Sequence, residues 1–334
     1  MASSSVTAVS RNAAPLADAP GGSAYVTADR GVLDRGAIVF AENCARCHSS
    51  KQPPPDVVPS SEAGRAWYRQ SVLSPDFREN NFLSTDRRYP ITEIGTNACR
   101  ALGTNATRGE IWDSFSSETY KTLPPVGTIE LYNPADNSTP YRFAVPAGGV
   151  GYYRPPSLIA IWSSAPFLHN NSVGTFSGDP SIAGRMRAFD DAIEKLLWPE
   201  RRLGKDSIWR TTHESYLRIA ETYLPAVLWP LARDGYLSIG PIPTGTPINL
   251  PANIDPRGPN AIAILRAIDE ALLEWVRNGA SRVWRDDDEA MKKLVSTLMS
   301  VSKCPDLVED RGHVFGSRLL DEDKRALIEF LKML

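Results

Sequence analysis

Two cysteines and a histidine, Cys44, Cys47 and His48, are the residues of this sequence whose types and spacing point most directly to chemistry. Thiols three positions apart add to the two vinyl groups of a haem as thioethers, and a neutral imidazole directly after them binds the iron. A structural zinc site takes four ligands, and the other cysteines, Cys99 and Cys304, form no second close pair. A thioredoxin-like motif would follow a strand, whereas the residues before Cys44 have a helical pattern. The motif therefore predicts one covalently attached haem c with His48 on its iron, and a zinc or dithiol site is the alternative.

The second axial ligand of the iron has to come from elsewhere in the chain. His313 lies between Gly312 and Gly316 in a loop, directly before an expected C-terminal helix that would pack beside the haem. This position favours His313 as the sixth iron ligand. Two alternatives stay open: His313 bonds only to backbone, or Met291 or Met299 is the ligand, although methionine at helical spacing more often fills a core.

His169 and the two spare cysteines are the remaining candidates. His169 follows Pro166 and precedes two asparagines, so we expect a turn tucked against a neighbouring segment, with His169 near a haem edge or propionate. His213 has no supporting context and is expected at the surface. In an oxidising compartment two spare thiols often pair, so Cys99 and Cys304 are expected either to form a disulfide or to be two separate buried thiols.

Two helices are expected to enclose the haem segment. Residues 32–44 have an amphipathic pattern, and Gly36 on the apolar face predicts close approach of another backbone. At the end of the chain, acidic residues at 321–323 suit a helix start, and Leu327 and Phe330 begin an apolar stripe at helical spacing. This combination resembles the way small class I cytochromes c are closed.

The long segment between these helices predicts further secondary structure. Apolar periodicity indicates helices over 184–198 and 259–277, and an acidic run at 286–289 opens another helix. Capping of a helix start explains that run better than calcium binding. Residues 120–160 are rich in proline, glycine and tyrosine and are expected to form loops with short strands.

The expected fold class is mainly α, with a class I cytochrome-c-like haem domain and a large loop-rich and helical insertion. Residues 1–30 are expected to be a disordered tail or linker. Residues 31–334 are expected to be a single cytochrome c domain, with the haem core from 31–60 and 305–334 and the insertion at 61–304.

Composition and charge exclude several kinds of partner. The 334 residues carry a net charge of −2, which argues against nucleic acid. No apolar stretch approaches the about 20 residues of a membrane span. Haem c is normally attached outside the cytoplasm, so the protein is expected to be periplasmic or secreted, yet the small, polar N-terminus lacks a signal-peptide pattern. We therefore expect that Met1 is not the natural start of the exported protein, and that the chain is either part of something longer or the product of a split or mis-started gene.

The motifs resemble the bacterial di-haem cytochrome c peroxidase superfamily, and they look closest to the C-terminal, second-haem half of its rubber-oxygenase-like branch. The resemblance covers about residues 31–334 and rests on the segments 43–48, 151–158, 165–171 and 310–316, with support from 116–121 and Gly127. The haem motif alone indicates only a cytochrome c. Pro-Ser-Leu at 156–158 and Ala-Pro-Phe-Leu-His at 165–169 narrow the resemblance to the superfamily.

The resemblance implies an electron-transfer role more than a complete enzyme. Members carry two haem motifs, and this chain has one. In the branch it resembles, the haem of the C-terminal half relays electrons between two histidine ligands, matching His48 and His313, while oxygen is handled at the other haem. The implied partner is a redox protein or an N-terminal haem half. The alternative is an oxidoreductase, a haem peroxidase or dioxygenase with an open distal site, for which His169, Trp162 and Trp198 are conceivable partners.

Overall fold

Two compact units make up the chain in the computed structural model. The structure describes residues 15–106, 122–133, 140–145, 151–254, 262–263, 265–266, 268, 270 and 289–334. The first unit comprises Met1–Thr96, Tyr152–Leu203 and Asp310–Leu334, and the second comprises Asn97–Gly151 and Gly204–Glu309. Segments that the sequence assigns to the insertion, 61–96 and 152–203, thus belong to the same unit as the haem motif.

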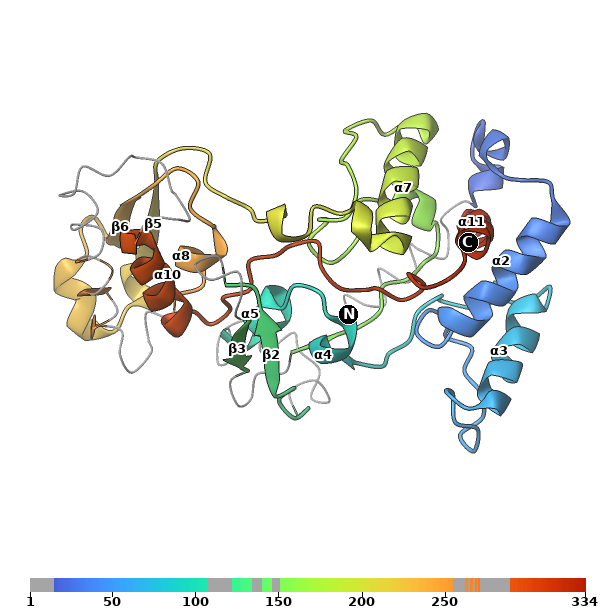
Figure 1. The fold of residues 1–334 in the computed structure, drawn as a ribbon, viewed down its shortest axis with the longest axis horizontal. Helices are drawn as coiled ribbons and strands as arrows, with labels where there is room; N and C mark the ends of the chain where they lie inside the picture. The colour runs from blue at the N-terminus through green and yellow to red at the C-terminus, as the bar shows by residue number, and fades with distance from the viewer. Residues whose placement is uncertain are drawn as a thin grey trace. The chain divides into compact units, whose positions relative to one another are not determined.

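The first unit is built around the two helices expected to enclose the haem segment. Helix α2 (Arg30–Asn43) begins after Asp29, whose carboxylate accepts two backbone N–H groups of the first turn. Helix α11 (Asp321–Leu331) starts with three acidic residues, as predicted, and contacts α2 extensively (Figure 1). A Cβ atom added to Gly36 would lie 2.1 Å from the carbonyl oxygen of Ala326. The predicted close approach of another backbone at Gly36 is therefore confirmed.

Helix α7 (Ile182–Leu197) confirms the helix predicted over 184–198, and Pro199 follows its end. Its apolar face joins α2 and α11 in one core, in which Phe40, Phe189 and Leu327 are buried. The other elements of this unit are α3 (Glu62–Leu73), α4 (Ile91–Ile94), the antiparallel pair β1 (Tyr89–Pro90) and β4 (Tyr152–Tyr153), and 3-10 turns at Leu16–Asp18, Gly22–Tyr25, Ile161–Ser163 and Pro199–Arg201.

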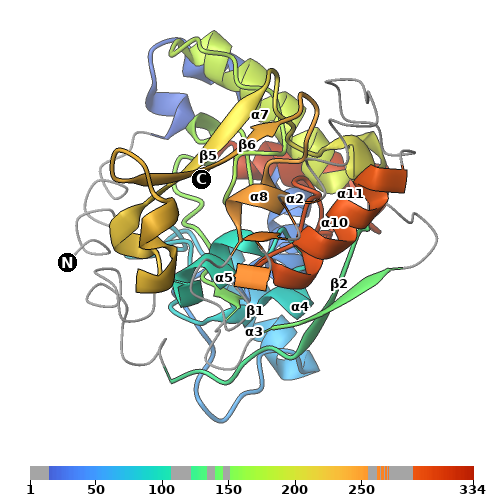
Figure 2. The same cartoon turned by 90° about the vertical axis from the view of Figure 1, so that its left-hand side faces the viewer.

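The second unit holds two β-hairpins and short helices. Strands β2 (Thr128–Leu131) and β3 (Tyr141–Ala144) pair antiparallel, as do β5 (Ser215–Ala220) and β6 (Tyr236–Ile242), with β5 and β6 side by side in Figures 1 and 2. The remaining elements are α5 (Cys99–Ala106), α8 (Asn249–Ala252), α10 (Glu289–Val301), and 3-10 turns at Gly204–Asp206, Glu221–Tyr223 and Ala226–Leu231. A separate core packs α8 against α10 through Leu250 and Val295.

The predicted fold class is wrong. Helices account for about 40% and strands for 14% of the structure, so the chain is not clearly mainly α, and nothing in the fold positively indicates a cytochrome c domain. Within the described ranges the strands form three two-stranded sheets. The strands that were not predicted are β5 and β6, and the first residues of β5 alternate between half-buried and exposed with the period of a strand. This two-residue period differs from the helical period on which the predicted fold class rested.

The remaining sequence-based expectations concern the N-terminal segment, the short strands and two further helices. Residues 16–25, assigned to a tail, contain two 3-10 turns, and Leu16 is fully buried. The short strands predicted within 120–160 are confirmed by β2, β3 and β4. The helix expected over 259–277 and the acidic residues 286–288 lie mostly or wholly outside the described residues. Helix α10 begins at Glu289, next to that run.

Candidate haem site

The haem-attachment motif forms one further turn directly after α2. The backbone N–H groups of Cys47 and His48 both donate to the carbonyl oxygen of Cys44, at 3.0 and 2.9 Å. The two cysteines are partly buried free thiols one helical turn apart, which places them on the same side of the turn. Burial raises the pKa of the Cys44 thiol to about 12, and the neighbouring Cys47 acts in the same direction. Cys44 therefore stays protonated at neutral pH.

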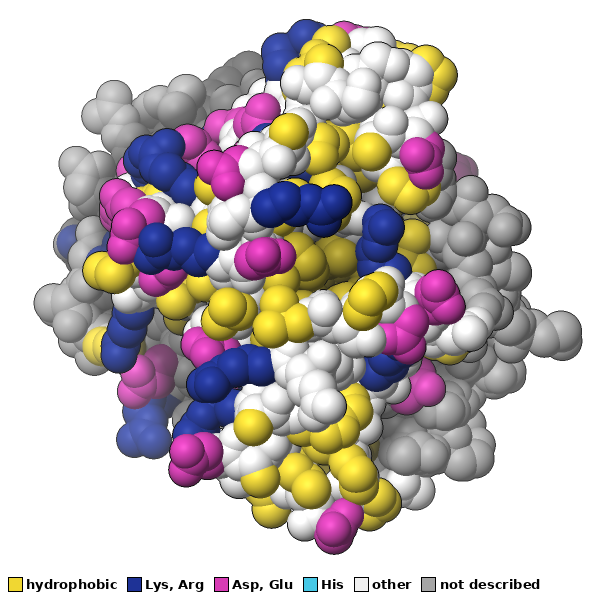
Figure 3. Space-filling view, turned by 90° about the vertical axis from the view of Figure 1, so that its right-hand side faces the viewer, with side chains coloured by type: hydrophobic (Ala, Val, Ile, Leu, Met, Phe, Trp, Pro, Cys, Tyr) yellow, Lys and Arg dark blue, Asp and Glu magenta, His cyan; other side chains and the backbone are white. Residues whose placement is uncertain are grey.

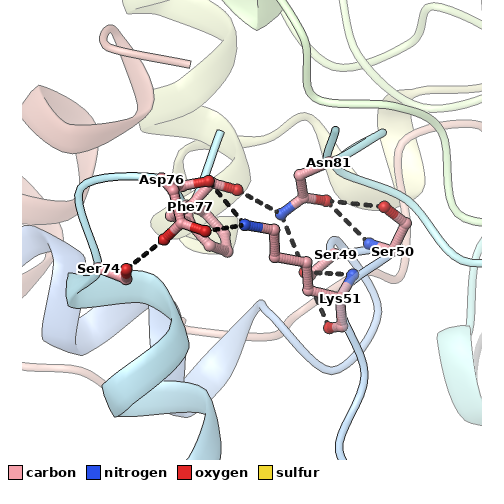
Figure 4. Close-up of polar contacts among 7 residues, drawn as sticks. All are labelled: Ser49, Ser50, Lys51, Ser74, Asp76, Phe77 and Asn81. Carbon is pink, nitrogen blue, oxygen red and sulfur yellow. Dashed lines mark hydrogen bonds and ion pairs between the residues drawn. The ribbon is translucent and has the colours of Figure 1, made fainter. Parts of the chain in front are cut away.

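The chain that follows the motif is fixed by a buried asparagine, Asn81 (Figure 4). Its amide oxygen accepts from the backbone N–H of Ser50 at 2.9 Å, from the Ser50 hydroxyl at 3.1 Å and from the backbone N–H of Leu83 at 2.9 Å. Its amide nitrogen donates to the Ser49 hydroxyl and to the Phe77 carbonyl, both at 3.1 Å. With only 4% of its surface exposed, Asn81 uses both polar atoms to hold the exit of the haem motif.

Replacing Asn81 by alanine is expected to lower the free energy of unfolding by about 3 kcal/mol, because it leaves buried donors and acceptors unpaired. The measurement is chemical denaturation followed by circular dichroism. The control is Ser74→Ala, at the margin of the same cluster, where the hydroxyl donates to the exposed carboxylate of Asp76 and the expected change is about 0.5 kcal/mol. Equal losses in the two variants would contradict a central role for Asn81.

The imidazole of His48 is oriented by the backbone of another segment. Its Nδ1 lies 3.2 Å from the carbonyl oxygen of Pro156, in the loop after β4. Because a carbonyl oxygen only accepts, Nδ1 carries the proton in this hydrogen bond and Nε2 is left as the free lone pair. A metal-binding histidine commonly uses this arrangement, since the hydrogen bond sets both the tautomer and the ring orientation.

The structure brings the ring of His313 close to the ring of His48. The centroids of the two rings are 6.3 Å apart, and the ring planes are inclined by 58°. An imidazole nitrogen lies about 2 Å from a metal that it binds and about 1 Å in front of its ring centre, so two imidazoles on opposite sides of one metal have centroids roughly 6 Å apart. The separation observed here therefore fits one iron between the two histidines.

The loop that carries His313 is held by the segment after β1. The backbone N–H of His313 donates to the carbonyl oxygen of Ile94, the last residue of α4, at 2.7 Å. The neighbouring Glu93 accepts from the Arg46 guanidinium, within the haem motif, at 2.8 Å. Helix α4 thus contacts both segments that supply the two histidines. His313 itself adopts a left-handed φ of 46°, which is uncommon for a residue with a side chain.

Both imidazoles are kept neutral by their surroundings. Burial lowers the pKa of His48 to about 3, and the facing His313 acts in the same direction. Burial lowers the pKa of His313 to about 4, and the charge of Arg202 also lowers it. Neutral imidazole is the form that binds a metal, so at pH 7 neither group has to lose a proton first.

The donor set fits a haem better than a bare metal ion. A haem supplies four ligands to its own iron, so the protein needs to add only two imidazoles and two thioether sulfurs. Within the described parts of the chain, no cluster of three or more histidine, cysteine or acidic side chains could hold a metal ion. One ring nitrogen, Nδ1 of His313, is buried and has no hydrogen-bond partner among these residues.

The other candidates have different surroundings. The ring of His169 stacks on Tyr153 at 4.7 Å, and Tyr153 pairs in register with Tyr89, whose hydroxyl donates to the carbonyl oxygen of Arg46 in the haem motif at 3.4 Å. His169 is therefore connected to the motif through two tyrosines, and its predicted place at a haem edge stays a prediction. Met299 is buried in the core of the second unit, and the methionine alternative stays a prediction.

The two candidate tryptophans are buried, and the two spare cysteines are paired. Trp198 is buried and its indole N–H donates to Asp321 at 2.9 Å, joining the end of α7 to the start of α11. Trp162 is also buried in the core of the first unit. Cys99 and Cys304 form a disulfide, so the first of the two expectations for them is confirmed.

Comparisons of the chain with protein-family models, with curated proteins and with solved structures found no match. Among the residues that the structure describes, no helix has the length and hydrophobicity needed to cross a membrane.

Proposed function

We propose that this protein binds one covalently attached haem c and transfers electrons, as the relay-haem part of a di-haem oxidoreductase of the kind that its sequence resembles. The observation that carries the proposal is the pair of facing imidazoles, 6.3 Å apart, with two free thiols on the turn that ends in one of them. The haem iron, when bound, carries one electron at a time between its ferrous and ferric states.

Four side chains of this protein would hold the haem, each through a different bond. Cys44 and Cys47 tether it, His48 binds one face of the iron with its ring set by Pro156, and His313 closes the other face. Two imidazoles favour a low reduction potential, whereas a methionine would raise it. With both faces occupied, the site passes electrons without binding oxygen or peroxide.

Apolar packing supports a water-poor setting for the group. The rings of Phe40 and Phe330, from α2 and α11, lie 5.3 Å apart in the core behind the motif. Figure 3 shows the face of the first unit that carries α2, α3 and α11, with apolar side chains gathered in a recess bordered by both basic and acidic side chains. A redox partner protein or an N-terminal haem half is the partner that this proposal requires. The Cys99–Cys304 disulfide supports an oxidising compartment, periplasmic or extracellular.

The test is to produce the chain in a host that matures c-type cytochromes and to record its mass and spectra. We expect a mass gain of one haem that survives denaturation and a low-spin spectrum that carbon monoxide and cyanide leave unchanged. His313→Ala should open one face, giving a high-spin spectrum and carbon monoxide binding. The control, His213→Ala, changes an exposed side chain of the second unit and should leave the spectrum as it was.

Two results would overturn this proposal in different ways. A colourless protein without the mass gain would exclude attached haem altogether. A high-spin parent that binds carbon monoxide at once would exclude the closed relay site and favour the alternative, a haem peroxidase or dioxygenase with an open distal face.

A further inference from the structure

Arg202 follows α7 and reaches the loop that carries the second proposed iron ligand. Its guanidinium donates to four backbone carbonyl oxygens: Nε to Lys195 at 2.7 Å, Nη2 to Leu196 at 3.0 Å, and Nη1 to Asp310 at 2.9 Å and to Gly312 at 2.6 Å. All of these residues belong to the first unit. An arginine whose donors go to four carbonyl oxygens in two separate segments is a clamp between those segments.

One side of this clamp is the C-terminal end of α7. The carbonyl of Lys195 would accept a helical hydrogen bond from the residue four positions on, but that residue is Pro199, which has no N–H. Arg202 donates to this carbonyl instead, so the end of the helix is satisfied by the side chain that also reaches the loop. Because two of its four bonds go to the end of α7, the guanidinium of Arg202 is held in place by the helix.

The other side of the clamp is the loop at 310–313. Arg202 bonds to carbonyls on both sides of Arg311, and the carboxylate of Asp310 in turn accepts the backbone N–H of Leu203 at 2.9 Å. The two segments are thus tied by reciprocal contacts immediately before His313. The guanidinium bonds to the carbonyl of Gly312, the residue directly before His313, so its charge lies next to that loop position.

We propose that Arg202 is a positioning residue for the sixth iron ligand: it holds the loop so that His313 stays on the iron, and it places a permanent positive charge beside that ligand. This inference rests on the proposed function. Arginine keeps its charge at any physiological pH, and a positive charge near a haem favours the ferrous state, which is less positive by one charge. The charge of Arg202 therefore raises the reduction potential of the haem, whereas its two imidazole ligands lower it.

The experiment compares haem-loaded full-length variants by spin state, carbon monoxide binding and redox titration. In Arg202→Gln we expect the population with an open distal face to rise about tenfold. Added imidazole should restore the low-spin spectrum, because the open position is then filled from solution. In the imidazole-saturated proteins, Arg202→Gln should have a reduction potential lower than Arg202→Lys by about 59 mV, a tenfold change in the one-electron equilibrium constant, since only lysine keeps the charge.

The matched control is Arg201→Gln. Arg201 is the adjacent residue, and its guanidinium pairs with Glu194 at 2.6 Å on the exposed side of α7. This variant should keep the spectrum and potential of the parent. If Arg202→Gln does not fold, Arg202→Lys is decisive, because a single ammonium group cannot reach four carbonyls and should also open the site.

The outcomes separate this inference from the function on which it rests. A low-spin parent whose Arg202→Gln and Arg202→Lys forms stay closed to carbon monoxide would overturn the role of Arg202 alone. A parent without attached haem, or with a high-spin haem, would overturn the proposed function, and the role of Arg202 would fall with it.

Discussion

Gly36→Ala is expected to lower the free energy of unfolding by about 3 kcal/mol, because the new methyl group has no room between α2 and α11. The added Cβ would lie 2.1 Å from the carbonyl oxygen of Ala326 and 2.8 Å from the Cβ of Phe330. The first of these is a backbone atom, so the whole helix has to move. The higher helix propensity of alanine offsets only about 1 kcal/mol of this loss. Chemical denaturation followed by circular dichroism measures the difference.

Gly31→Ala is the matched control for this effect. Gly31 lies in the first turn of the same helix and is exposed, and the nearest atom to its added Cβ is a side-chain oxygen of Asp29, at 3.3 Å. Here the gain in helix propensity is not opposed by a backbone, so the expected change is within about 1 kcal/mol. If Gly36→Ala were as stable as Gly31→Ala, the close packing of α2 on α11 would be refuted.

Gly312→Ala is expected to release His313 from the haem. Gly312 has a φ of 76°, and a Cβ there would lie 2.2 Å from the carbonyl carbon of Gly95 and 2.2 Å from the backbone nitrogen of Thr96. Both atoms belong to the segment after α4 that holds the His313 loop, so the loop must move away from it. The expected result is a high-spin haem that binds carbon monoxide, together with a loss of about 3 kcal/mol in unfolding free energy.

Gly95→Ala controls for the backbone conformation alone. Gly95 has nearly the same φ, 72°, but the nearest atom to its added Cβ is 3.5 Å away. Both variants carry the left-handed penalty of about 1 kcal/mol, and only Gly312→Ala forces two backbones apart. Gly95→Ala should therefore keep a low-spin haem. A low-spin, carbon-monoxide-insensitive Gly312→Ala protein would mean that this contact does not place His313.

Local patterns predicted the main helices and the short strands within 120–160, but they did not predict the hairpin of β5 and β6. Helices α2, α7 and α11 carry long apolar stripes at helical spacing, and all three form where expected. Strand β5 alternates half-buried and exposed residues over its first positions, and this two-residue period is not detected by helical spacing. The predicted fold class therefore contained too much helix, although the prediction of helices α2 and α11 is confirmed.

The positioning residues could not be found from the sequence. Asn81 bonds to the distant Ser50 and Arg202 to the distant Asp310 through backbone groups, and such partners leave no residue-type signature. Pro156 contributes only a carbonyl oxygen to His48, which any residue in that place could supply. The sequence shows a glycine at position 312, beside His313. Why a glycine is needed there follows only from its tertiary contact with the backbone of Gly95.

By itself, the sequence determined that two thiols and an imidazole lie together. Cys44, Cys47 and His48 are close along the chain, so covalent geometry and one helical turn suffice to bring two thiols and an imidazole to one place. Only the tertiary structure decided that His313 faces His48 at 6.3 Å. The distance between residues so far apart in sequence depends on the packing of α2 on α11 and on the contacts of the His313 loop with α4 and Arg202, and no local pattern encodes either.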